Sequence, residues 1–108
     1  MIAYVSAPYS KIDDKHALMR LIAKQSGMWM LANPGWFAIT GLVHHYAAQE
    51  CSELGTDYVF WETWCEEFLQ QCDKLLVLEI DGWDNSVGVQ AEIALAHRLM
   101  IPVEYLKV

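Results

Sequence analysis

The sequence has few basic residues, and they form no cluster. Seven Lys and Arg stand against 14 Asp and Glu among 108 residues, which gives a net charge of -7. A surface of this sign repels a nucleic-acid backbone, so polymeric DNA or RNA is not expected as a partner. A small anionic ligand is still compatible with this charge, because helix N-termini and backbone amides bind phosphate without Lys or Arg.

Long apolar runs and paired cysteines are also absent. Polar residues interrupt every apolar stretch before it reaches the roughly 20 residues of a membrane span. The first residues, MIAYVSAP, lack the basic flank and long apolar core of a signal peptide. Cys51, Cys65 and Cys72 are odd in number and never spaced C-x-x-C, which indicates reduced thiols rather than disulfides or zinc ligands. We therefore expect a cytoplasmic protein without membrane contact.

No internal repeat, linker or low-complexity tract divides the chain. With 55% hydrophobic residues in 108, it is long enough for one core and too short for two, so residues 1–108 are expected to form one domain. Five tryptophans are many for this length, and Trp is enriched in pockets and at subunit interfaces. A homodimer or higher homo-oligomer is therefore expected.

Expected strands alternate with expected helices. Short apolar runs predict strands over residues 2–6, 36–40, 74–80 and 102–106. A first helix should follow Ser10 and Asp13, which resemble a capping box, and should end near residues 33–35, Asn-Pro-Gly. Its apolar face is predicted to hold Leu18, Leu21, Ile22, Gln25 and Met28.

Two further helices are expected, and one segment is ambiguous. Asp57 can cap a helix in which Trp61, Cys65, Phe68 and Cys72 recur at helical spacing, and residues 86–99 form the next helix. Residues 41–55 read as irregular or partly helical. Trp61, Trp64 and Phe68 favour a core or interface role, with base stacking as the alternative.

This order predicts right-handed parallel βαβ units. We therefore expect an α/β fold, a doubly wound (Rossmann- or flavodoxin-like) three-layer sandwich around a four- or five-stranded parallel sheet. Ligands of such sheets bind beyond the carboxyl ends of the strands. Residues 6–10, 40–45 and 81–88 follow three of the strands and should meet there.

The loop over residues 81–88 carries the strongest signal. Asp84, Asn85 or Ser86 can cap the next helix, so that the Ser86 hydroxyl and the amides up to Gly88 form an anion site. Glu92 lies one turn after Gly88 on the same face, among apolar neighbours. Partial desolvation would raise its pKa and make the anion more reactive as a nucleophile or base. The alternative is a solvated carboxylate that only interacts with the helix dipole.

The stretch DNSVGVQAEIALA resembles the signature of the nucleoside 2-deoxyribosyltransferase superfamily, and most closely its 2'-deoxynucleoside 5'-monophosphate N-glycosidases. YVSAPYS and CDKLLVLEIDGW extend the likeness to small phage and bacterial proteins of that superfamily, whereas residues 41–60 are covered weakly. The resemblance implies that Glu92 attacks C1' of the sugar and that Ser86 and the amides near Gly88 hold the 5'-phosphate. Tyr4 matches a glycosidase Tyr, and Tyr9 lies in the loop that would close over the sugar or base.

The remaining candidates come from the same loops. Ser6 and His44 are expected to contact the substrate, and Asp81 and Asp84 could hydrogen-bond sugar hydroxyls or a base edge, Asp81 with a catalytic role. The alternative for both Asp residues is turn formation and capping. His44 and His45 are adjacent and point in different directions, so no metal is expected, and no cofactor is implied.

One departure from the glycosidases keeps two functions open. Cys65 stands where they carry an Asp that assists departure of the base, although Glu62 and Glu66 on adjacent turns could reach inward. The first hypothesis is an enzyme that cleaves or exchanges the N-glycosidic bond of a (deoxy)nucleoside 5'-monophosphate. The second is a nucleotide-binding module without turnover. A third is a flavodoxin-like interaction protein in which the loop over residues 82–88 is only a turn and a cap.

Overall fold

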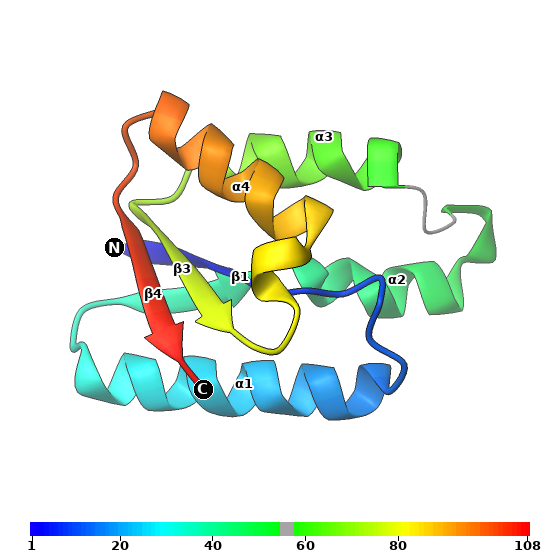
Figure 1. The fold of residues 1–108 in the computed structure, drawn as a ribbon, viewed down its shortest axis with the longest axis horizontal. Helices are drawn as coiled ribbons and strands as arrows, with labels where there is room; N and C mark the ends of the chain where they lie inside the picture. The colour runs from blue at the N-terminus through cyan, green and yellow to red at the C-terminus, as the bar shows by residue number, and fades with distance from the viewer. Residues whose placement is uncertain (55–57) are drawn as a thin grey trace.

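The computed structural model describes residues 1–54 and 58–108. Their strands form an all-parallel sheet of order β2-β1-β3-β4, from β1 (Ile2–Ser6), β2 (Phe37–Thr40), β3 (Lys74–Glu79) and β4 (Val103–Lys107). Helix α1 (Lys15–Ala32) covers one face of the sheet, and α3 (Tyr58–Leu69) and α4 (Val87–Arg98) lie on the other (Figure 1). The predicted flavodoxin- or Rossmann-like α/β fold is confirmed, with four strands.

Strand β3 is the centre of the core because both of its faces are covered. Leu75 and Val77 pack with α3 and α4, whereas Leu76 and Leu78 pack with α1. All four side chains are fully buried. A continuous apolar run is the pattern expected of a parallel strand with helices on both sides. Each of these side chains contributes roughly 1.5–3 kcal/mol by leaving water.

Helix α1 begins later than the sequence suggests. Its N-cap is Asp14, whose side chain accepts a hydrogen bond from the Ala17 amide at 2.9 Å, so the capping box of Ser10 and Asp13 is wrong. The buried stripe contains Leu18 and Ile22 as predicted and continues through Ser26 and Trp29. Met28, predicted for this stripe, is exposed, because Trp29 takes the inward position in the last turns.

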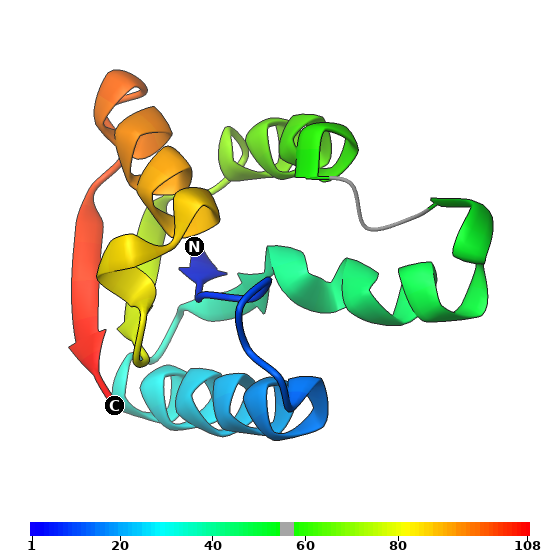
Figure 2. The same ribbon diagram turned by 45° about the vertical axis from the view of Figure 1, so that its right-hand side comes forward.

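The ambiguous segment folds into short helices that extend from the end of β2 (Figure 2). A 3-10 turn, η1 (Gly41–Val43), leads into α2 (His44–Glu50) and a second 3-10 turn, η2 (Ser52–Leu54). The expected Asp57 cap lies outside the described residues. Helix α3 ends at Leu69 rather than at Cys72, and Cys72 is buried in the turn that follows, where its amide bonds to the Leu69 carbonyl.

A polar network joins the sheet to α1 at the amino end of β3. Lys74 forms an ion pair with Glu104 of β4 at 2.8 Å, and the Trp29 indole donates to the other carboxylate oxygen at 2.9 Å. The Lys74 ammonium also lies 4.8 Å from the centre of the Trp36 ring. Nowhere in the described part of the chain is there a helix with both the length and the apolar character needed to cross a membrane.

Candidate functional site

A cavity of about 270 Å³ opens at the carboxyl ends of the central strands. The chain leaves β1 toward α1 on one face and leaves β3 toward α4 on the other (Figure 1), which is the arrangement that creates a ligand crevice in open parallel sheets. Its lining comes from the β1 loop, the η1–α2 segment, α3 and the start of α4: Tyr4, Val5, Ser6, Ala7, Tyr9, Ser10, Gly41, Leu42, His44, His45, Ala48, Trp61, Glu62, Cys65, Glu66, Ser86, Val87, Gly88, Ala91, Glu92 and Leu95.

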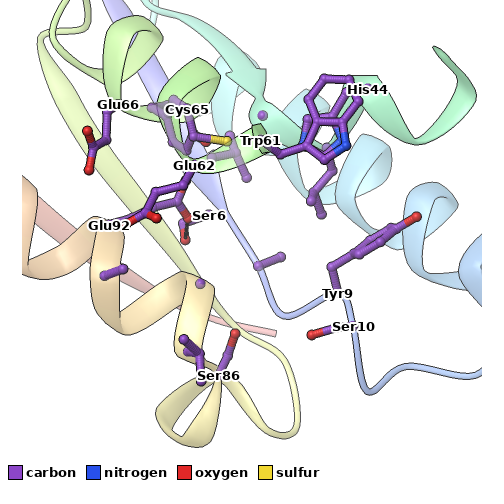
Figure 3. A pocket seen from close by; sticks show the side chains of 18 of the residues that line it. Ser6, Tyr9, Ser10, His44, Trp61, Glu62, Cys65, Glu66, Ser86 and Glu92 are labelled. Atoms are coloured by element: carbon purple, nitrogen blue, oxygen red, sulfur yellow. Dashed lines mark hydrogen bonds between the residues drawn. The ribbon is translucent and has the colours of Figure 1, made fainter. Parts of the chain in front are cut away.

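Glu92 projects from α4 into this cavity, one turn beyond Gly88 (Figure 3). The Ser6 hydroxyl donates a hydrogen bond to its Oε1 at 2.7 Å, which fixes the carboxylate at the end of β1. Burial raises the pKa of Glu92 to about 7, and the hydrogen bonds from Ser6 and Tyr4 offset part of this rise. Near neutral pH the carboxyl group therefore exists in both protonation states, as acid–base and nucleophilic groups require.

Tyr4 and Cys65 form the floor beside Glu92. Tyr4 is fully buried in β1, and desolvation, followed by the neighbouring Glu92 and Cys65 charges, raises the pKa of its phenol. Burial raises the pKa of the Cys65 thiol to about 11, so the thiol stays protonated at neutral pH. Gly41 is needed here, since a Cβ at this position would lie 2.1 Å from Tyr4 Oη and 3.2 Å from Cys65 Sγ.

Ser86 forms the rim of the cavity at the start of α4. It is the N-cap of this helix, and its Oγ accepts a hydrogen bond from the Val89 amide at 3.3 Å. Its hydroxyl proton therefore remains available to a ligand. The first amides of a helix have no acceptor within the helix, and Val87 and Gly88 also line the cavity. This rim can bind an anionic group without a basic side chain, and no Lys or Arg occurs among the described lining residues.

Aromatic side chains form the opposite end. The His44 ring stacks on Trp61 with centroids 4.1 Å apart and an interplanar angle of 21°. Tyr9 Oη and His45 Nδ1 form a hydrogen bond, and the two rings meet edge to face. Burial lowers the pKa of both histidines, so they are neutral at pH 7. In Figure 3, Tyr9 and His44 lie across the cavity from Glu92.

Most of the predicted site residues meet in this cavity: Tyr4, Ser6, Tyr9, His44, Ser86, Gly88 and Glu92. Asp81 and Asp84 do not line it and are exposed. Asp81 precedes Gly82, whose φ of 93° turns the chain, and Asp84 lies in the 3-10 turn η3 (Trp83–Asn85). The structure therefore places both in the turn that the sequence analysis gave as their alternative.

The sequence favoured a core or interface role for Trp61, with base stacking only as the alternative, and it did not single out His45 of the two adjacent histidines. Trp61, Glu62, Cys65 and Glu66 all line the cavity from α3, and their i, i+4 spacing is the signal that places them on one side of that helix. Trp64 stacks on Phe68 at 5.4 Å, outside the lining. Within residues 1–54 and 58–108, no three His, Cys, Asp or Glu side chains are grouped so as to hold a metal ion.

Comparison with known proteins places the chain in a family. No curated protein matches the sequence. A family described as a domain of unknown function, DUF1937, matches residues 1–107, which is nearly the whole chain. The matched range includes every element of the sheet and every residue that lines the cavity. The chain therefore belongs to the DUF1937 domain family.

Proposed function

We propose that the cavity binds a (deoxy)nucleoside 5'-monophosphate and that Glu92 attacks C1' of the sugar to break the N-glycosidic bond. The observation that carries this proposal is the position of Glu92. Its carboxyl group has a pKa of about 7, is oriented by Ser6 at 2.7 Å, and faces a cavity large enough for a small ligand. The resemblance of DNSVGVQAEIALA to the deoxyribosyltransferase superfamily supports the same residue as nucleophile.

The reaction divides into two steps. A carboxylate oxygen of Glu92 bonds to C1' while the C1'–N bond breaks, and the base leaves with the electron pair and takes up a proton. Water then attacks C1' and returns a proton to the group that protonated the base, which breaks the C1'–Glu92 bond and releases the sugar 5-phosphate; attack by a second base instead gives base exchange. A nearby carboxylate stabilises the oxocarbenium-like transition state of both steps. Glu62 and Glu66 line the same cavity and are the candidates to supply the proton.

Substrate orientation follows from the two ends of the cavity. The Ser86 hydroxyl and the first amides of α4 would hold the 5'-phosphate at the rim. Glu92 lies about one turn deeper on the same helix face, which suits a sugar C1' below its own phosphate. The base would then extend toward Tyr9, His44 and Trp61. Asp81 and Asp84 have no part in this arrangement.

A second candidate function is a nucleotide-binding module without turnover. Cys65 favours it, because a thiol with a pKa of about 11 is a poor proton donor where the resembling glycosidases carry an Asp. The helix-end site at Ser86 would be retained in such a module. Both functions are compatible with the cavity, whereas an interaction protein without a ligand would have no use for it.

The test incubates the protein with a panel of deoxyribo- and ribonucleoside monophosphates and measures the released free base by chromatography. Wild type should release base, and Glu92→Gln should not. Glu50→Gln is the matched control, because Glu50 is exposed at the end of α2 and does not line the cavity. If wild type binds a nucleotide, shown by a higher unfolding temperature, and releases no base, the binding module replaces the enzyme. Equal release by wild type and Glu92→Gln would exclude Glu92 as the nucleophile.

A further inference from the structure

His45 is a buried polar residue of the cavity wall with an unused nitrogen. It is 5% exposed, and its Nε2 has no hydrogen-bond partner among the described residues. Buried side-chain nitrogens in proteins almost always have a partner, and leaving one without costs stability. The ring lines the cavity, so a bound molecule can supply the missing partner.

We propose that His45 Nε2 is a specificity determinant that donates a hydrogen bond to an acceptor atom of the nucleotide base, a carbonyl oxygen or a ring nitrogen. This inference rests on the proposed function, because it takes the ligand of the cavity to be a nucleotide. It adds a recognition point for the base to the groups already assigned to the sugar and the phosphate.

The other nitrogen of the ring determines the chemistry of Nε2. Burial keeps the pKa of the Tyr9 phenol above its ordinary value and that of His45 below it, so both groups are neutral at pH 7. A phenol is the stronger donor and an imidazole nitrogen the stronger acceptor. We therefore assign the hydrogen bond as Tyr9 Oη donating to Nδ1, which leaves the proton of the ring on Nε2. In this tautomer His45 presents a donor.

Tyr9 is itself held in place, so the tautomer is fixed by a rigid contact. The Lys15 ammonium donates to the backbone carbonyls of Tyr9 and Ile12 and lies 4.5 Å from the centre of the Tyr9 ring. Lys15 therefore ties the loop between β1 and α1 to the first turn of α1. A donor supported in this way is preorganised, which reduces the entropic cost of binding.

The surroundings of His45 favour a base over a phosphate. The cavity is also lined by Tyr9 from the loop after β1, Leu42 from η1 and Ala48 from α2. Aromatic and aliphatic walls of this kind suit a flat heterocycle. Figure 3 places Tyr9 and Ser86 on separate parts of the rim, with Ser86 beside the α4 end. The phosphate site and the Tyr9–His45 pair are thus different parts of one cavity.

The experiment measures binding in a Glu92→Gln background, where turnover is blocked. Two classes of ligand are titrated by calorimetry: deoxynucleoside 5'-monophosphates, and 2-deoxyribose 5-phosphate, which has the same sugar and phosphate and no base. His45→Phe, added to this background, keeps an aromatic ring and removes both nitrogens. It should lower the affinity for the best-bound nucleotide by about five- to tenfold, which corresponds to one neutral hydrogen bond. Affinity for deoxyribose phosphate should stay within about twofold, since that ligand has no base to contact.

Unchanged nucleotide binding, or an equal loss for both classes of ligand, would overturn the proposal. His45→Gln retains an N–H donor and should keep more affinity than His45→Phe; identical losses in the two variants would also count against it. Without ligand, thermal unfolding shows whether His45→Phe still folds; this variant loses the unpaired Nε2 and also the acceptor of the Tyr9 hydroxyl. If no ligand of either class binds, the inference falls. Failure of the proposed catalysis is seen separately, as nucleotide binding by wild type without base release.

Discussion

Replacement of Glu92 by Gln should make the protein more stable at alkaline pH, even though it removes the proposed nucleophile. The pKa of Glu92 rises from 4.5, the value of an exposed side chain, to about 7 in the folded state. The folded protein thus binds a proton that the unfolded chain has already lost. The contribution is fully present below pH 4.5 and is lost as the pH rises through 7.

The size of the effect follows from that interval. At about 1.36 kcal/mol per pH unit, the interval from 4.5 to about 7 gives an upper bound of about 3 kcal/mol. The side chain is partly exposed to the open cavity, so we expect about 2 kcal/mol. Gln keeps an oxygen for the Ser6 hydroxyl and carries no charge. Glu92→Gln should therefore equal wild type at pH 4.5 and exceed it by about 2 kcal/mol at pH 8.

Urea unfolding at half-unit intervals from pH 4.5 to 8.5 measures this difference. Glu104→Gln is a control in which the effect on stability should depend on pH in the opposite direction. Its hydrogen bond and ion pair with Lys74 lower the pKa of Glu104, so its contribution is present at neutral pH and is lost on acidification. Parallel stability curves for Glu92→Gln and wild type across this range would refute the buried, proton-binding state of Glu92.

The remaining predictions concern the same cavity. Gly41→Ala should destabilise the protein by about 2 kcal/mol and impair ligand binding, because the new Cβ would lie 2.1 Å from Tyr4 Oη. Gly27→Ala is the control: a Cβ there meets open space in α1, so this variant should be as stable as wild type or more stable. Thermal unfolding measures both variants. Base release should increase with pH around a midpoint near 7, because Glu92 ionises there. Ser6→Ala should move this midpoint upward, because it removes a hydrogen bond that lowers the pKa of Glu92. A rate of base release that falls with pH would exclude an ionised nucleophile. A thiol reagent should modify exposed Cys51 rapidly, Cys65 slowly because its thiol lines the cavity with a raised pKa, and buried Cys72 only after unfolding; fast modification of Cys72 would contradict the packing. A homo-oligomer remains a prediction from the sequence, which analytical ultracentrifugation tests.

Periodicity predicted the fold well because the signals for its central elements are local. The apolar run of β3 and the capping candidates at 84–86 lie in continuous stretches of sequence; the structure has the strand where it was expected and Ser86, one of the three candidates, as the N-cap. The cap of α1 was misassigned because Ser10, Asp13 and Asp14 all offer side-chain acceptors within a few residues. In the structure the Asp14 side chain is the one that accepts the helix amide, that of Ala17.

The cavity could be predicted only in part. Ser6, Ser86 and Glu92 follow strands or begin a helix, so topology alone brings them together. His45 and Trp61 come from α2 and α3, whose packing depends on contacts distant in sequence. The exclusion of Asp81 and Asp84 depends on a turn at Gly82 with a φ of 93°, and sequence indicates such a turn without giving its direction.

The ion pair at the amino end of β3 has a consequence for ionic strength. Lys74–Glu104 is the one ion pair found in the described part of the chain, and the sequence has twice as many acidic as basic residues. Repulsion among carboxylates therefore outweighs attraction, and salt reduces both as the Debye length falls from about 30 Å at 0.01 M to about 3 Å at 1 M. The domain should accordingly be least stable in dilute buffer and gain stability as sodium chloride is added.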